Sequence, residues 1–360
     1  MRNVAGRQIL ASLIVGTGAL LLGPSSFAQS VADGADAPAA AVEAAAEVLG
    51  GHVKAFRDFP WYEPLRAEPH EGKVQLLIPA WAKEFPHSVE PGTRFSWQIT
   101  LGREIPIVAV TPQIADANGR MDPKTWGIGL WTPVHFHVIE DFKDPSAPIV
   151  DTDYRFGAMV KFQYGLSKTR WLGIRYTPWA HESTHLGDEY TIVAPMVDPA
   201  FERVNVSYEY QEYGISFEAS DLLSEGDDWT FRHGGIIPWG SDGYYSDHLL
   251  TSDEPTLTPS KKNYEPSFGV EFLMPEWRDR QTYFSFDLRD KLIYNYHQTP
   301  ESPETRQWSF NLQIGRTAPA NERRALKDYF IQFYRGVNPY GQLRSQKDWW
   351  SIGIGWTFGL

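Results

Sequence analysis

The chain has 360 residues, no cysteine and a formal net charge of −12. Without cysteine it can form no disulfide framework, thiolate metal site or cysteine nucleophile. The acidic balance gives no electrostatic reason to bind nucleic acid, because neutralising phosphates requires a basic surface. Aromatic residues make up 14% of the chain, with 14 Trp and 17 Tyr, and these residue types concentrate at membrane interfaces.

Residues 1–28 are predicted to be a secretory signal peptide. Two arginines within the first seven residues precede an apolar run that ends at Leu22, and the small residues Ser26 and Ala28 form a cleavage site. The apolar run is shorter than the about 20 residues that a membrane-spanning helix needs. We therefore expect export and cleavage after Ala28, with an uncleaved anchor as the alternative.

Residues 29–93 are predicted to be a leader followed by an irregular segment. The leader is rich in Ala and acidic residues, and the rest carries Pro and aromatic residues without a clear period. Only the stretch from Val74 to Ala82 has the composition of a strand, and the sequence does not assign it. We expect this region to cap the periplasmic mouth of the domain that comes after it.

From Arg94 to the end of the chain, apolar and polar residues alternate with a period of two, which is typical of strands with one apolar face. About twelve segments show it: 94–110, 125–138, 154–165, 169–180, 201–210, 213–221, 228–235, 266–274, 281–290, 306–316, 327–335 and 348–359. Export, aromatic enrichment and small or amide residues on the polar face favour a transmembrane antiparallel β-barrel over residues 94–360. A soluble periplasmic sandwich is the alternative.

The predicted strand order conflicts with the lengths of the loops. Barrels place short turns at the periplasmic end and long loops outside. Counting back from a C-terminal strand that ends in the periplasm puts the long loop at residues 181–200 on the periplasmic side. One strand is therefore missing or misplaced in the assignment.

The stretch from His181 to His185 matches His-Glu-x-x-His, which on a helix holds zinc with Glu182 as general base. The flanking sequence predicts a strand instead, and Pro178 and Gly187 leave too little room for a helix. A zinc metalloprotease is therefore disfavoured.

As a strand, the same stretch places His181 and Ser183 on one side, close enough for the imidazole to take the hydroxyl proton. Asn205 on the following strand would orient that imidazole if the two strands pair side by side. These residue types in this order predict a serine ester hydrolase.

The pattern His181-x-Ser183 followed by Asn205 resembles outer-membrane phospholipase A, whose Ser, His and Asn act in ester hydrolysis. The segment from Tyr334 to Gln342 is similar to its aromatic and glycine-rich penultimate loop. A closer similarity is to an uncharacterised bacterial outer-membrane family of unknown function, in which His-x-Ser-Ser-His-Leu-Gly-Asp-Glu-Tyr recurs. It covers most of the chain from Arg94 to Leu360.

The resemblance implies that Ser183 is the nucleophile, His181 the base and Asn205 the residue that fixes the imidazole tautomer. It also implies an active site on the lipid-facing exterior. The interval from His to Asn is longer here than in the phospholipase, and its calcium ligands find no match. Calcium therefore stays open, with Asp188 and Glu189 as oxygen donors.

The alternation of side chains along the strands predicts that these residues face the lumen, opposite to the lipid-facing site that the resemblance implies. His181 and Ser183 share the polar, lumen-facing side with Arg175, and Asn205 shares the lumen side of its own strand, unless a bulge at Pro178 reverses the faces of the residues after it. The second hypothesis is therefore a non-enzymatic barrel, a channel or a structural envelope protein. In it a polar network braces a long loop, formed by His181, Ser183, His185, Asp188, Glu189 and Asn205.

The predicted location is the outer membrane of a Gram-negative bacterium. The partners expected for such a barrel are outer-membrane lipids and the barrel assembly machinery, with a homodimer left open and nucleic acid excluded.

Overall fold

The computed structural model divides the chain into two compact units, Met1–Val53 and Lys54–Leu360. It describes residues 52–55, 61–68, 73–83, 92–111, 121–142, 148–187, 206–239, 264–293, 305–318, 326–340, 343 and 346–359. A four-residue strand, β1 (His52–Ala55), spans the boundary between the units. Within the described ranges, no helix combines the length and the apolar character needed to cross a membrane.

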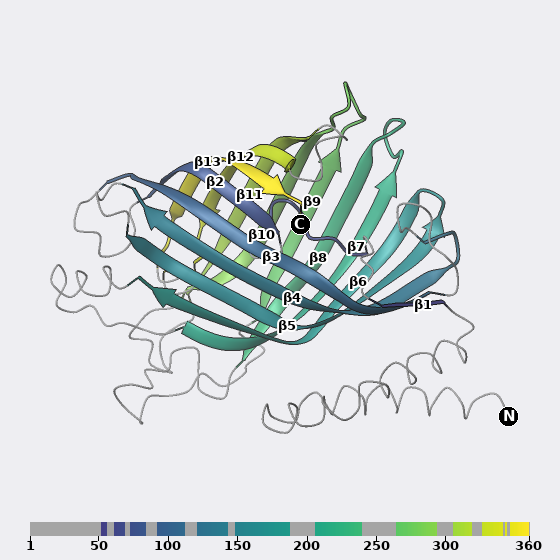
Figure 1. The fold of residues 1–360 in the computed structure, drawn as a ribbon, viewed down its shortest axis with the longest axis horizontal. Coiled ribbons are helices and arrows are strands. Elements are labelled where there is room, and N and C mark those ends of the chain that lie inside the picture. The colour runs from purple at the N-terminus through teal and green to yellow at the C-terminus, as the bar shows by residue number, and fades with distance from the viewer. Residues whose placement is uncertain are drawn as a thin grey trace. The chain divides into compact units, whose positions relative to one another are not determined.

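The second unit is a closed antiparallel β-barrel (Figure 1). Each strand pairs with its neighbours in the sequence, and β13 pairs with β2 to close the sheet. Twelve strands in the described residues form it: β2 (Val74–Ala82), β3 (Arg94–Thr111), β4 (Trp126–Asp141), β5 (Ile149–Ser167), β6 (Arg170–Leu186), β7 (Val206–Ser220), β8 (Asp228–Trp239), β9 (Glu265–Leu273), β10 (Thr282–Ile293), β11 (Thr305–Thr317), β12 (Leu326–Gly336) and β13 (Trp349–Phe358).

The predicted barrel of about twelve strands is confirmed, but two of the predicted boundaries are corrected. The barrel begins at Val74 rather than Arg94, because β2 lies between β13 and β3. The predicted segments 201–210 and 213–221 are joined in one strand, β7, over residues 206–220, which pairs without interruption with β8. Adding β2 and merging two predicted segments into β7 leaves the number of strands at twelve.

These two corrections remove the conflict over loop sides. Counting back from β13, β6 ends and β7 begins at the end of the barrel opposite the one where β13 ends. The turns at the C-terminal end include the two-residue connection from β5 to β6 and the seven-residue connection from β7 to β8. The connections at the opposite end include the 19 residues between β6 and β7 and the 25 residues between β8 and β9, which matches the extracellular side of such barrels. The 14-residue connection from β3 to β4, at the C-terminal end, departs from this pattern.

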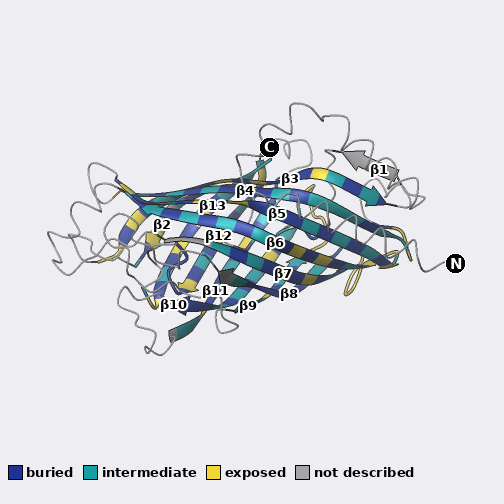
Figure 2. Ribbon diagram, turned by 90° about the horizontal axis from the view of Figure 1, so that it is seen from below, coloured by how far each residue is buried: buried dark blue, intermediate teal, exposed yellow. Residues whose placement is uncertain are grey.

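The outer face of the barrel is apolar and the inner face is polar, as the alternating burial along each strand in Figure 2 reflects. Ile215 is 54% exposed and Ile331 is 57% exposed, whereas Lys161 and Arg175 inside are only 2% and 1% exposed. A soluble protein has the reverse arrangement. Apolar side chains outside and charged ones inside define a transmembrane barrel, because hydrocarbon solvates the outer face.

Ion pairs connect strands β3 to β7 in the barrel interior. Lys161 contacts Glu104, and Arg175 contacts both Glu104 and Glu212. Arg94 lies 3.4 Å from Asp141 in a separate pair. Buried charges are costly unless they are paired, so these pairs hold the wall strands to one another.

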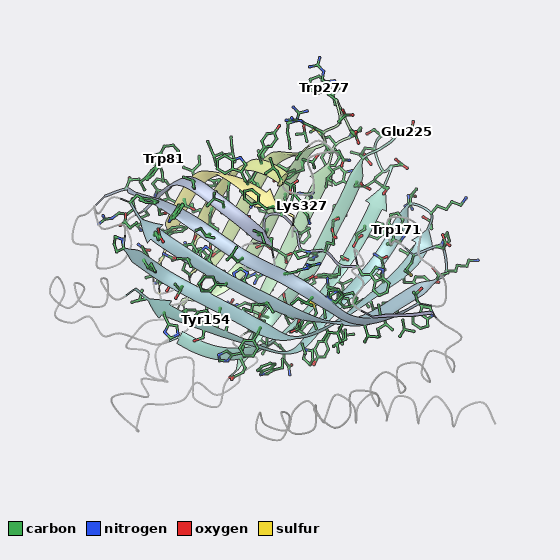
Figure 3. All side chains as sticks on the ribbon, viewed as in Figure 1. Trp81, Tyr154, Trp171, Glu225, Trp277 and Lys327 are labelled. Atoms are coloured by element: carbon green, nitrogen blue, oxygen red, sulfur yellow. The ribbon has the colours of Figure 1, made fainter. Side chains whose placement is uncertain are left out.

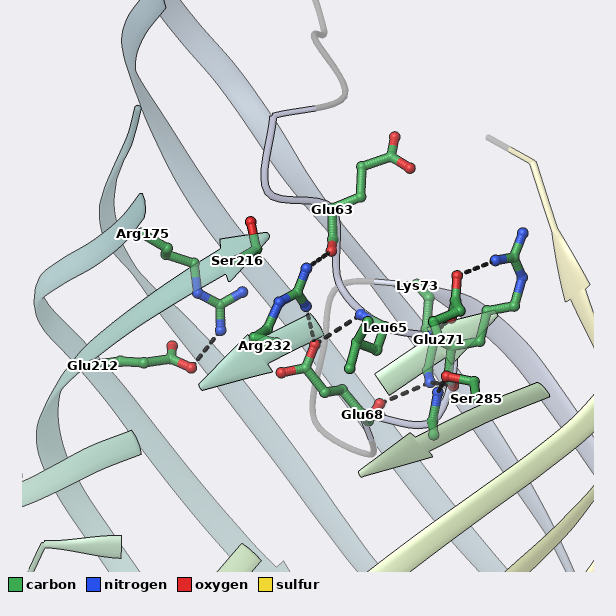
Figure 4. A network of polar contacts seen from close by, with 12 residues as sticks. Glu63, Leu65, Glu68, Lys73, Arg175, Glu212, Ser216, Arg232, Glu271 and Ser285 are labelled. Atoms are coloured by element: carbon green, nitrogen blue, oxygen red, sulfur yellow. Dashed lines mark hydrogen bonds and ion pairs between the residues drawn. The ribbon is translucent and has the colours of Figure 1, made fainter. Parts of the chain in front are cut away.

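Residues 61–68 lie inside the barrel, in contact with inward-facing side chains of several strands (Figure 4). We call them the plug segment. The sequence predicted that the region before the barrel caps the periplasmic mouth, and these residues fill part of the interior. Trp61 and Ala67 are fully buried.

The lipid-facing assignment of the outer wall predicts a position-dependent cost of charge. Ile215→Arg should lower the free energy of unfolding by about 2–4 kcal/mol, as a cation does near the middle of a bilayer. The matched control Leu223→Arg, in the exposed turn between β7 and β8, should change it by less than about 1 kcal/mol. Urea unfolding in lipid vesicles measures both, and equal effects would contradict the assignment.

Candidate active site on the barrel exterior

A bulge beside Pro178 exchanges the faces of strand β6. Along its first half, Arg175 and Thr177 are buried and face the interior. The pairing with β7 then shifts register between Thr177 and Ala180, and the pairing with β5 shifts at the same level. Proline has no N–H to donate to a neighbouring strand, so it is found at such irregularities. Beyond the bulge, the buried residues are Ala180, Glu182, Thr184 and Leu186.

His181, Ser183 and His185 therefore face outward, and the predicted lumen-facing orientation is wrong for these residues. The burial along β6 shows the exchange directly, because each of the three lies between two buried neighbours. The cause is the bulge at Pro178, which was named from the sequence as the one feature that would reverse the faces of the residues after it. One extra residue on a strand reverses which face each later side chain occupies.

Glu209 on β7 is the polar partner of His181. The two residues are directly paired across the strands, and the imidazole Nδ1 lies 3.5 Å from the carboxylate Oε1. Their side chains are 25% and 30% exposed. A carboxylate at Nδ1 orients the ring and leaves Nε2 to act on a neighbouring group, which is the arrangement that a catalytic histidine requires.

Asn205, the predicted third member, lies outside the described residues, as do Asp188 and Glu189. The register nevertheless corrects one part of the prediction, because the position across from His181 is held by Glu209. The predicted faces of β7 are also reversed: Tyr210 is buried inside and Glu209 faces outward. The strand is uninterrupted, so the outward apolar residues Tyr213 and Ile215 determine the side on which Glu209 lies.

Tyr154 on β5 lies directly across from Ser183 on the side away from β7. It is 39% exposed and lies between two buried neighbours on β5, so it faces outward; Figure 3 labels it among the side chains of the wall. Its ring lies 5.5 Å from that of His185, while Phe156 lies 5.4 Å from the ring of His181. Ser183 thus has an imidazole two residues away along the strand on either side and a phenol on the adjacent strand.

Strand β6 does not supply the helix that the zinc motif needs. His181 and His185 lie on an extended chain that ends at Leu186, so the zinc interpretation lacks its geometry. In the described part of the chain, no group of three or more His, Asp or Glu residues is placed to hold a metal ion.

A family model described as "Protein of unknown function (DUF1207)" matches residues 87–224, which include the candidate site. None of the curated proteins compared with the chain matches it.

Several solved barrels are similar to this chain at low sequence identity. Outer membrane phospholipase A from Escherichia coli is 10% identical, with 83% of this chain and 93% of that chain covered and a TM-score of 0.43. The translocator domain of the autotransporter NalP from Neisseria meningitidis is 8% identical, with 92% and 98% covered and a TM-score of 0.36. The β domain of the Bordetella autotransporter BrkA is 7% identical, with 81% and 100% covered and a TM-score of 0.34.

The absence of native cysteine allows a direct test of the reversed face. A Ser183→Cys variant in lipid vesicles, carrying a fluorescent maleimide, should be quenched by lipids with a nitroxide on the acyl chain. A Thr184→Cys variant should resist labelling, because Thr184 is fully buried on the inner side. If Thr184→Cys were labelled and quenched while Ser183→Cys resisted labelling, the bulge at Pro178 would not have reversed the faces of β6.

Proposed function

We propose that this chain is an outer-membrane barrel that hydrolyses an acyl ester with a serine on its lipid-facing wall. The observation that carries the proposal is the outward position of His181 and Ser183, with the Glu209 carboxylate at His181 Nδ1. Ionisable residues on a lipid-facing surface are costly, so their presence favours a functional role over a structural one.

The proposed chemistry uses the three side chains as nucleophile, base and orienting acid. Ser183 Oγ attacks the ester carbonyl while His181 Nε2 takes the hydroxyl proton, which then passes to the departing alcohol. Water activated by the same imidazole splits the acyl-enzyme, releasing a fatty acid and restoring Ser183. Glu209 positions the ring and stabilises its charged form.

Two neighbours could stabilise the negative oxygen that develops on the substrate carbonyl. Tyr154 carries a hydroxyl on the strand beside Ser183, and His185 contacts its ring. Side-chain donors of this kind, fixed before the reaction begins, stabilise a tetrahedral intermediate.

An envelope lipid is the substrate class that this position favours. The site lies near the end of β6 that is opposite the C-terminus, which is the extracellular side in barrels of this kind. A lipid ester could reach Ser183 from the surrounding membrane, and outer-membrane lipids and the barrel assembly machinery are the corresponding partners. His181, Ser183 and Glu209 come from one chain, so the proposed mechanism does not depend on a homodimer.

The second candidate is a non-enzymatic barrel in which these residues brace the strand ends. The His181 and Glu209 pair joins β6 to β7, and Thr152 Oγ1 lies 3.4 Å from the His185 carbonyl oxygen and donates to it across β5 and β6. Both contacts would stabilise the wall without any reaction.

Replacing the nucleophile separates the two candidates. The wild type should hydrolyse a diacyl phospholipid in mixed micelles, and Ser183→Ala should lower kcat at least about 10³-fold, because the attacking oxygen is lost. A preserved heat-dependent shift in gel mobility shows that the variant is folded. Equal rates for wild type and variant would favour the bracing role. Parallel assays with a chelator and with added Ca²⁺ test whether the reaction requires calcium.

The orienting residue is tested by comparing Glu209→Gln with Asn205→Ala. Glu209→Gln should lower kcat about 10²-fold or more with a small change in KM, because the amide cannot stabilise the imidazolium. Asn205→Ala should retain most of the activity. A large loss confined to Asn205→Ala would restore the assignment made from the sequence.

A further inference from the structure

We infer that the barrel interior is closed to solutes at two levels, by the plug segment and by the chain around Tyr340, so that the protein is not an open channel. This inference is independent of the proposed ester hydrolysis, which uses the outer face. It rests on how the wall is shaped around the plug segment and on what fills the interior beyond it.

Inward-facing glycines in the wall make room for side chains of the plug segment. A Cβ at Gly127 of β4 would collide with the ring of Trp61, and one at Gly214 of β7 would collide with the hydroxyl of Tyr62. A Cβ at Gly269 of β9 would likewise meet Leu65. Three glycines on three strands, each facing a different plug side chain, indicate a wall shaped to hold this segment.

Polar contacts hold the plug segment to strands around the barrel (Figure 4). Glu68 accepts a hydrogen bond of 2.6 Å from Arg232 on β8, and Arg66 pairs with Glu271 on β9 and Asp328 on β12. The backbone of Ala67 is held as well: its N–H donates to Ser285 Oγ on β10 at 3.0 Å, and its carbonyl accepts from Asn311 Nδ2 on β11 at 2.6 Å.

Tyr62 shows how firmly the segment is held. Its φ of 52° is in the left-handed region, which is unfavourable for a bulky side chain and persists only where packing imposes it. The guanidinium groups of Arg232 and Arg175 lie 4.1 and 5.1 Å from the centre of its ring. Trp61 packs edge-on against Trp131 with ring centres 5.7 Å apart.

A second closure lies toward the opposite end of the barrel. The ring of Tyr340, in the connection after β12, stacks on His137 with centres 5.0 Å apart, and its hydroxyl donates to Gln98 at 2.6 Å. Burial raises the pKa of this hydroxyl well above its ordinary value, so it remains a neutral donor. Tyr340 and Leu343 are 6% and 2% exposed.

Two cavities border these groups. One of about 350 Å³ lies against the plug segment and reaches the barrel end where β8 begins and β13 ends, with Asp228 and Phe358 in its lining. Another, of about 20 Å³, is lined in part by Tyr340 and His137. The cavity beside Tyr340 is about the size of one water molecule, so the described residues leave little free space at that level.

Single-channel recording in planar bilayers tests the inference. The wild type should give no conductance steps above the bare bilayer. A variant that combines Arg66→Ala, Glu68→Ala and Tyr340→Ala should conduct, because it loses the plug anchors and the second closing ring. The matched control Glu63→Ala, whose exposed side chain lies in the same segment, should stay silent. Retained heat-dependent gel mobility shows that each barrel is folded.

Two results would overturn the inference. Stable conductance steps from the wild type would show that the interior is open as it stands. A folded triple variant that is as silent as the wild type would show that the closure does not depend on these groups.

Discussion

The two-residue period of strand β6, interrupted beside Pro178, determines which of its side chains reach the outer wall of this barrel. Because side chains alternate between lipid and interior, every residue after the extra one changes sides. Arg175 and Thr177 before the bulge face the charged interior, whereas His181 and Ser183 after it face outward. Without the bulge, the same residues would belong to the interior network and could not meet a lipid.

The two faces of the wall therefore have separate roles. The interior is filled by paired charges and by the plug segment, which together tie the strands across the lumen. The exterior carries the candidate site on β6 and β7, near one end of the barrel and beside exposed apolar residues such as Tyr213 and Ile215. A rigid, closed interior helps to hold the exterior site in place. The position of a catalytic side chain is only as fixed as the strand that carries it and the packing behind that strand.

Much of this fold could be predicted from the sequence, since period-two alternation is a local property. Strands such as Trp349–Phe358 show it without ambiguity. The short β2 could not be assigned to the barrel with the same certainty, because its apolar run does not alternate and only its pairing with β13 and β3 defines its place. The plug segment has no period at all, and its position depends on contacts with distant strands.

The candidate site was predictable in its residues but not in its geometry. His181 and Ser183 follow from their spacing, whereas Glu209, which the structure places across from His181, was not singled out as the orienting residue. The register between β6 and β7 depends on the connection from 187 to 205, whose length does not reveal which residue lies opposite His181. A proline in an alternating strand is the signal that could have reversed the predicted face, and its effect becomes certain only when the pairing on both sides is known.

If Ser183 is an activated nucleophile exposed to the membrane, as proposed, it should react with a long-chain alkyl fluorophosphonate when the wild type is treated in lipid vesicles. Peptide mass spectrometry should then find the phosphonyl group attached to Ser183 with loss of fluoride, and the protein with Glu209→Gln should react much more slowly. An unmodified Ser183, or equal labelling of other serines, would contradict the proposal.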